Sequence, residues 1–263
     1  MLVKSFTKRL QPHLLNTSVA CFFAGNSKSK AMKQLIHLAA FVAGSAAVLA
    51  GDVTGTITLK GTPPPEKPIA PLNADPNCGK VAKGPVTTRH YVVGAGGGLG
   101  NVVVYVKGGL EGKKFDAPAT KAVMDQVACL YEPYVMAAQV GQAVEIRNSD
   151  PFLHNVNFMK SDAGNKTFNF AQGGAAKPVD KVFENQEVFV KFQCNVHPWM
   201  FGYIGVVANP YFAVTDKDGK FTIKGLPAGK YTVAIKHLKA GEIVQELEVK
   251  DSGAELKAVL EVK

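Results

Sequence analysis

One stretch of the sequence decides the fold: Phe192-Gln193-Cys194-Asn195-Val196-His197-Pro198-Trp199-Met200. It continues an alternating apolar and polar run over 188–192 that is typical of a β-strand. It then places a thiol, an imidazole and a thioether three residues apart, at Cys194, His197 and Met200. A loop this short can bring the three side chains around one point. This set of donors favours copper over zinc, calcium or magnesium.

A blue-copper centre needs one more nitrogen, because its ligands are two imidazoles, one thiolate and a weak axial Met. The strand-like run Asp150–Phe158 supplies it at His154. A single His on a strand is more often a core residue, and a buried Cys is more often structural. The fixed spacing of the downstream His and Met favours the ligand interpretation of Cys194.

Residues 131–207 resemble the cupredoxin family of small blue copper proteins, of the amicyanin and plastocyanin type. The ligand loop is closest in spacing to that of amicyanin. The matching pieces are two strand patterns, one turn residue, a His-Asn pair and the loop itself, at Val140–Asn148, Gly202–Val207, Pro151, His154-Asn155 and Cys194–Met200. The resemblance covers about a third of the 263 residues.

The resemblance implies one type 1 copper ion held by four ligands, His154, Cys194, His197 and Met200. It implies that Asn155 ties its own loop to the loop that carries Cys194. It also implies that the ring edge of His197 reaches the surface inside an apolar docking patch formed by Pro198, Trp199 and Phe201. The alternative for the lone Trp is a place in the core.

Short alternating runs predict strands through the same region, at 135–140, 143–148, 154–158, 167–170, 187–194 and 204–207. Their spacing favours an antiparallel Greek-key sandwich over 115–207. The fold class is therefore predicted to be all-β.

Residues 208–263 have a different pattern. Residues 212–223 predict a hairpin with an Asp218-Gly219 turn, and a second turn at 225–230 precedes the strand 231–235. These pieces resemble the carboxypeptidase regulatory-like (prealbumin-type) sandwich. Because this segment is short for a sandwich, we expect it to be completed by strands from 51–114. The Greek-key cupredoxin sandwich would then be inserted in, or docked on, this prealbumin-like sandwich.

The connection between 60 and 101 contains few strand signals. Residues 71–90 read as a polar loop around Cys78, and 91–93 as a short strand. The glycine run 94–100 predicts a turn and no dinucleotide site, because the third glycine of G-x-G-x-x-G is replaced by Leu99. His90 and His237 lack neighbours at ligand spacing and are predicted to be surface or turn residues.

The first 50 residues are basic, with six Lys and Arg residues and no acidic residue. Residues 32–50 have a basic start, an apolar run and a small-residue end, which predicts a signal peptide cleaved after Ala50. The alternative is an uncleaved anchor, but the run is short for a membrane span. Residues 1–31 are interpreted as a start-site artefact or a disordered pre-region. Residues 51–263 hold 24 basic and 21 acidic side chains, a net charge of +3, so no nucleic-acid partner is expected.

Four cysteines are present, at positions 21, 78, 129 and 194. If processing removes the first and the last binds metal, Cys78 and Cys129 remain as a candidate disulfide between the two modules. The alternative is two unpaired thiols. A disulfide suits a periplasmic or otherwise exported protein.

We therefore predict an exported carrier of single electrons between redox proteins such as c-type cytochromes or a dehydrogenase. The alternative is a module that holds or delivers copper, or binds a surface, without carrying electrons; a third interpretation is a structural domain with an empty site. The sequence has no His-x-x-Glu, Cys-x3-Cys or His-x-His pattern, so no enzyme is expected.

Overall fold

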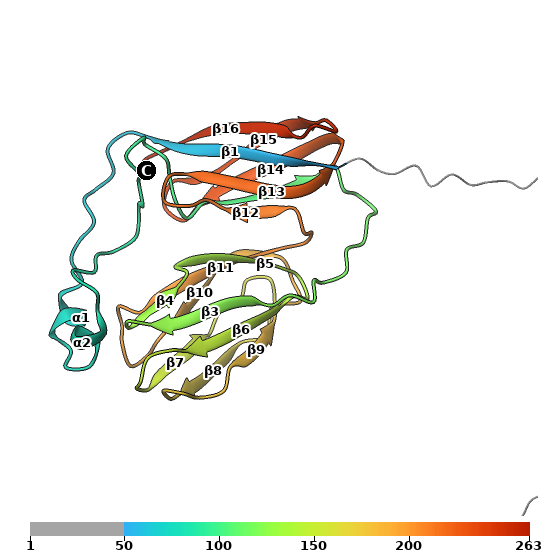
Figure 1. Ribbon diagram of the computed structural model, residues 1–263. Coiled ribbons are helices and arrows are strands. Elements are labelled where there is room, and N and C mark those ends of the chain that lie inside the picture. Colours follow the sequence, from blue (N-terminus) through green and yellow to red (C-terminus); the bar gives the residue numbers. More distant parts are fainter. Residues whose placement is uncertain (1–49) are drawn as a thin grey trace, which may run out of the picture. The chain divides into compact units, whose positions relative to one another are not determined.

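The computed structural model describes residues 50–263, so the interpretations of 1–31 and of 32–49 concern residues outside the described part. The described chain is almost entirely β (Figure 1). Its elements are β1 (Ala50–Lys60), α1 (Ala70–Ala74), α2 (Cys78–Val81), β2 (Val103–Gly108), β3 (Ala122–Val127), β4 (Leu130–Glu132), β5 (Val135–Gln139), β6 (Ala143–Asn148), β7 (His154–Phe158), β8 (Phe168–Gln172), β9 (Val179–Val182), β10 (Glu187–Gln193), β11 (Phe201–Val207), β12 (Phe212–Val214), β13 (Lys220–Pro227), β14 (Gly229–His237), β15 (Gly241–Val249) and β16 (Ala254–Glu261).

Strands β3–β11 form one sandwich, which we call the central sandwich. One sheet has the order β5-β11-β10-β7-β8 and the other the order β4-β3-β6-β9. Most neighbours are antiparallel, but β3 pairs with β6, and β5 with β11, in parallel. The expected antiparallel pairing is therefore found in most pairs of this sandwich and is wrong for these two. After β4 the chain leaves its sheet to form β5 in the opposite sheet, and it returns as β6 in the direction of β3.

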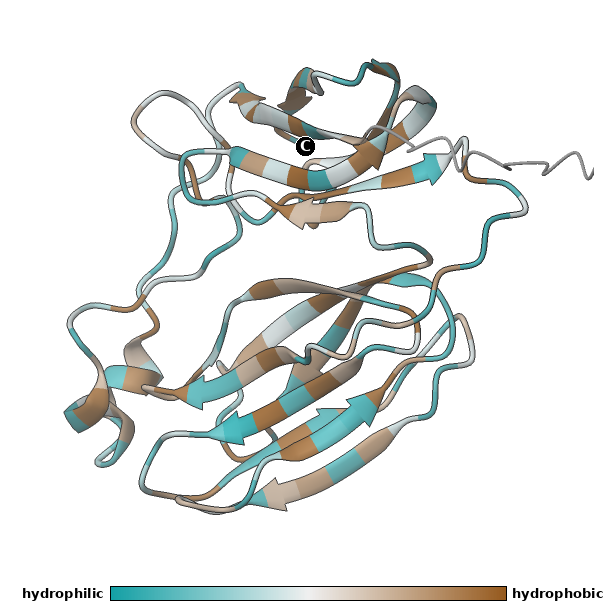
Figure 2. Cartoon of the chain, turned by 45° about the vertical axis from the view of Figure 1, so that its right-hand side comes forward, coloured by the Kyte–Doolittle hydropathy of each residue, from teal (hydrophilic) through white to brown (hydrophobic). Residues whose placement is uncertain are grey.

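The core of the central sandwich explains why its strands alternate in hydropathy (Figure 2). Successive side chains of a strand point to opposite faces, so one apolar set turns inward. The rings of Phe158, Phe183 and Phe192 are at most 2% exposed and lie 5.6–6.1 Å apart between centroids. Each such ring contributes about 2–3 kcal/mol by leaving water. This core supports β7, which begins at His154, and β10, which ends just before Cys194.

The remaining strands form a second sandwich, the terminal sandwich, with sheets β13-β1-β16 and β12-β2-β14-β15. Its strands come from both sides of the central sandwich in the chain, because β1 and β2 precede it and β12–β16 follow it. β1 pairs antiparallel with β13 and parallel with β16.

The predicted hairpin over 212–223 is wrong in one respect. The turn exists, with Gly219 at φ +76° and the Asp216 carboxylate accepting the N–H groups of Asp218 and Lys220 at 2.9 Å. However, β12 pairs with β2 and β13 pairs with β1. The turn therefore connects the two sheets, because each arm finds its hydrogen-bond partner in a different layer.

The segment between β1 and β2 is more ordered than the predicted loop, because it contains α1 and α2. We call residues 69–86 the cap. Its apolar side chains surround a buried disulfide between Cys78 and Cys129. Residues 91–93 form no strand and contribute only the bridge between Val93 and Leu99, which closes the glycine turn. No helix among the described residues has the length and apolar character needed to cross a membrane.

His237 differs from its expected surface position. Its side chain is 2% exposed at the end of β14, and its Nδ1 accepts the N–H group of Ala240 at 3.0 Å. Burial lowers the pKa of His237 to about 4. The absence of other candidate metal ligands near His237 in the sequence therefore did not indicate whether its imidazole is buried.

Candidate metal centre

The four predicted ligands lie on two elements of the central sandwich. His154 is the first residue of β7, and the others lie in the loop between β10 and β11. Those two strands pair antiparallel with Gln193 opposite Phe201, so the loop must reverse direction within seven residues. Two backbone bonds of 2.9 Å close it, from the Cys194 N–H group to the Met200 carbonyl and from the Met200 N–H group to the His197 carbonyl.

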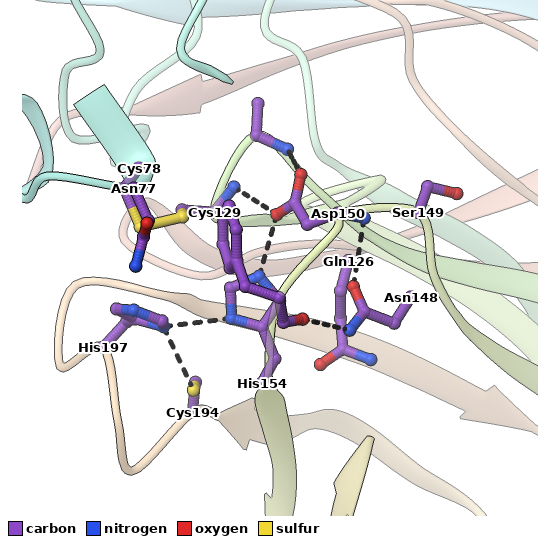
Figure 3. A network of polar contacts seen from close by, with 12 residues as sticks. Asn77, Cys78, Gln126, Cys129, Asn148, Ser149, Asp150, His154, Cys194 and His197 are labelled. Atoms are coloured by element: carbon purple, nitrogen blue, oxygen red, sulfur yellow. Dashed lines mark hydrogen bonds and ion pairs between the residues drawn. A yellow bond between two sulfur atoms is a disulfide. The ribbon is translucent and has the colours of Figure 1, made fainter. Parts of the chain in front are cut away.

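Three of the ligand atoms converge at one point (Figure 3). His154 Nδ1 lies 3.0 Å from His197 Nδ1, which lies 3.7 Å from Cys194 Sγ. All three residues are buried, with exposures of 0%, 6% and 2% for His154, His197 and Cys194. Two imidazole nitrogens and one sulfur at these separations are a set of donors that could hold a metal ion, and soft thiolate with imidazole suits copper.

Met200 is fully buried and belongs to the same apolar core cluster as Cys194. Its backbone takes part in both bonds that close the loop. The thioether is therefore positioned by the same turn that positions the thiol, and it packs within the core instead of facing water.

Asp150 is a site residue that sequence reasoning missed. Its Oδ2 lies 2.8 Å from His154 Nε2 and accepts the Cys129 N–H group at 2.8 Å, while Oδ1 accepts the Ala128 N–H group at 2.7 Å. A carboxylate only accepts, so Nε2 carries a proton, and Nδ1 faces the other ligands and can offer its lone pair once it loses its own proton. The sequence does place an acidic residue four positions before His154. However, Asp150 lies in a loop, and a loop has no regular repeat from which the contact between the two side chains could be predicted.

The electrostatics of Cys194 and His197 favour metal binding. Burial alone would raise the pKa of the Cys194 thiol, but hydrogen bonds from His154 and from nearby backbone N–H groups lower it overall. Burial, together with the charge of His154, lowers the pKa of His197. A deprotonated sulfur and an uncharged imidazole are the forms that bind a metal ion.

His154 and Asp150 depend on each other. Burial alone would lower the pKa of His154, but its hydrogen bonds with Asp150 and Cys194 raise it overall. Burial alone would raise the pKa of Asp150, but the bonds from His154 and from two backbone N–H groups lower it. In the absence of metal, the pair stabilises a protonated imidazole beside a carboxylate.

The side chain of Asn155 forms hydrogen bonds with the ligand loop and with β8. Its Oδ1 accepts the Asn195 N–H group at 2.5 Å, which ties β7 to the ligand loop. Its Nδ2 donates to Asn169 Oδ1 at 2.7 Å on β8. Its backbone carbonyl accepts the Tyr131 hydroxyl at 2.6 Å.

The surroundings of His197 differ from the predicted docking patch. The imidazole is only 6% exposed, and Trp199 packs against the buried cluster that Leu72 and Cys78 of the cap form with Cys129 of the β3–β4 turn. Phe201 is half-buried among Tyr134 and Tyr203, so only Pro198 is exposed. Trp199 is partly covered because the cap, which precedes the ligand loop by more than a hundred residues, packs on it. The exposed apolar residues beside the ligands are Leu153 and Val196, at 51% and 53%.

Comparisons with known proteins find likeness only among solved structures. No family model matches the chain, and no curated protein matches it. A purple cupredoxin from Nitrosopumilus maritimus is 27% identical over 32% of this chain and 98% of its own, with a TM-score of 0.26. A mutant of amicyanin in its reduced state is 20% identical over 39% of this chain and 97% of its own, with a TM-score of 0.30.

A third similar structure is a copper-containing nitrite reductase from Thermus scotoductus. It is 24% identical over 36% of this chain, with a TM-score of 0.30. The chain spans about a quarter of that enzyme, since the match covers 24% of its length. What the site does is therefore proposed from its own residues.

Proposed function

We propose that this protein is an exported type 1 copper protein that carries single electrons between redox partners and catalyses no reaction of its own. The observation that supports the proposal is the convergence of His154 Nδ1, His197 Nδ1 and Cys194 Sγ within 4.8 Å of one another. Soft thiolate together with imidazole suits copper, and Met200 from the same loop would be the weak axial ligand.

The residues have distinct roles in this proposal. Bound copper would supply a one-electron couple. His154, His197 and Cys194 would hold it from a rigid sandwich, so the ligands need little movement between oxidation states. Asp150 orients the His154 ring through Nε2, and Asn155 holds the ligand loop against β7. Outer contacts of this kind fix the orientation of metal ligands.

Export and partners belong to the same proposal. The buried disulfide between Cys78 and Cys129 suits an oxidising compartment such as the periplasm. Partners would be exported redox proteins, such as c-type cytochromes or a dehydrogenase. Leu153, Val196 and Pro198 are the exposed apolar residues adjacent to the ligands, and they suit a small, transient contact.

One observation favours the alternative of a copper-holding protein. The cap covers the side of the site on which His197 would otherwise meet solvent, leaving that residue 6% exposed. A covered site retains its metal well and exchanges electrons slowly. Electron self-exchange measured by NMR line broadening separates the two functions, because fast exchange supports the carrier and undetectable exchange supports the holder.

The first experiment is a visible spectrum of the purified protein after addition of Cu(II). We expect strong thiolate-to-copper charge-transfer absorption, and its loss in Cys194→Ala. Met159→Leu is the matched control, because this Met is 65% exposed and outside the site. A colourless wild-type protein would exclude Cys194 as a ligand of Cu(II).

A further inference from the structure

The disulfide lies against the candidate metal ligands (Figure 3). Cys78 and Cys129 are both fully buried, and their sulfurs lie with a ring nitrogen of His197 in a group whose atoms are all within 4.8 Å of one another. Cys129 also belongs to a second such group, with Asp150 and His154. A bond between two sulfurs therefore occupies space directly beside both imidazoles.

The cap is weakly attached apart from this bond. Its helices have only five and four residues. In the described part of the chain, no hydrogen bond joins residues 69–86 to the strands of the central sandwich. The noncovalent contacts are those of a small apolar cluster that includes Leu72 and Trp199, and the next attachment along the chain is the ion pair between Arg89 and Glu132. Elements with few buried contacts open at low free-energy cost, so a reductant can reach the disulfide.

Reduction changes what these residues can bind. A disulfide sulfur is a poor metal ligand, whereas a thiolate is a strong ligand for soft ions such as Cu(I). Thiolate–metal bonds are about 2.3 Å long for a first-row ion such as Zn²⁺. Donor atoms that are at most 4.8 Å apart can meet one ion between them through small side-chain rotations.

We propose that reduction of the Cys78–Cys129 disulfide creates a second copper site, in which the two thiolates and His197 bind Cu(I). The reductant is a dithiol. It gives two electrons and two protons to the disulfide and is itself oxidised to a disulfide. Each thiol then loses its proton as it binds Cu(I), and the imidazole contributes a lone pair. The new site shares His197 with the proposed type 1 site, so the two sites compete for that imidazole. Neither the reduction nor the binding involves Cys194, so the new site goes beyond the electron-carrier proposal.

The test uses the full-length chain with Cys21→Ser and Cys194→Ala, in which the proposed type 1 site lacks its thiolate and Cys78 and Cys129 are the remaining cysteines. The apo variant is reduced with dithiothreitol, desalted without oxygen and titrated with Cu(I) supplied as its bicinchoninate complex. We expect the reduced variant to remove one equivalent of Cu(I) from the complex and the oxidised variant to remove none. Further replacement of Cys78 and Cys129 by Ser should abolish uptake.

A variant without His197 tests whether the folded protein forms the Cu(I) site, because two thiols that chelate copper in any conformation would bind it equally well without this imidazole. Adding His197→Ala to Cys21→Ser and Cys194→Ala should weaken Cu(I) binding at least tenfold, while His90→Ala, the matched control, should not. X-ray absorption of the loaded variant should show two sulfur ligands and one nitrogen. An equal affinity for Cu(I) with and without His197 would overturn the proposal. This holds also if the equal affinity arises because the chain unfolds on reduction. The absence of uptake would also overturn the proposal.

Discussion

Asp150 and His154 form a buried hydrogen bond of 2.8 Å between Oδ2 and Nε2, with side-chain exposures of 3% and 0%. The same carboxylate accepts two backbone N–H groups next to the disulfide, at Ala128 and Cys129. One buried charge therefore links the ring of a candidate copper ligand to the β3–β4 turn that anchors the cap.

Replacing Asp150 by Asn should weaken copper binding. The amide keeps the shape but loses the charge that orients and polarises the His154 ring, and loss of such contacts costs about 10–100-fold in metal affinity. The reduction potential should rise, because a nearby negative charge favours Cu(II) over Cu(I). Competition titration and voltammetry measure the two effects. Ser149→Ala is the control, and an unchanged affinity in Asp150→Asn would contradict the assigned role.

Replacing Asn155 by Ala should loosen the ligand loop. The Asn195 N–H group loses its acceptor, which lowers the free energy of unfolding by about 1–2 kcal/mol. Copper should leave faster to a chelator. Asn169→Ala is the matched control, because it removes the second partner of Asn155 and leaves the bond to the loop intact. Equal chelation rates in the two variants would show that the loop holds its position without Asn155.

Replacing both Cys78 and Cys129 by Ser should lower the free energy of unfolding. A disulfide between residues 51 positions apart stabilises by about 4 kcal/mol in the chain-entropy model. Without it the cap opens more often, so His197 meets solvent more often and a chelator removes copper faster. Denaturant unfolding and the rate of chelation are the measurements. Wild-type rates of copper loss in the double variant would mean that the cap shields the site without the covalent bond.

His237 should make the terminal sandwich sensitive to acid. Its folded pKa of about 4 lies below the usual value of 6.5, so the unfolded chain binds the extra proton more readily. The stabilising contribution is complete above pH 6.5 and is lost as the pH falls towards 4. Between pH 7 and pH 5 the loss is about 2 kcal/mol.

Urea unfolding of the wild type and His237→Gln at both pH values tests this prediction. The variant should lose about 2 kcal/mol less than the wild type over the same interval, because Gln does not titrate. Lys239→Ala is the control at the neighbouring turn. Identical pH dependence in the wild type and His237→Gln would show that another group is responsible.

Much of the fold could be predicted because strands carry a local signal. The alternation in 154–158 and 187–194 corresponds to β7 and β10 almost residue for residue. β9 was missed because it has four residues, two of them charged, and no buried side chain. The hairpin over 212–223 was mispredicted for a different reason. An Asp-Gly turn defines a reversal of the chain and not the sheet in which each arm pairs.

The sequence by itself predicted that Cys194, His197 and Met200 lie on one short loop, because they are three residues apart and directly follow a strand pattern. Only the tertiary structure decided what surrounds that loop. Asp150 meets His154 through a turn without periodicity, and the cap reaches Trp199 from far upstream in the chain. Such contacts depend on packing between distant segments, which no local pattern encodes. The exposure of His197 and the position of the disulfide therefore followed from the folded structure alone.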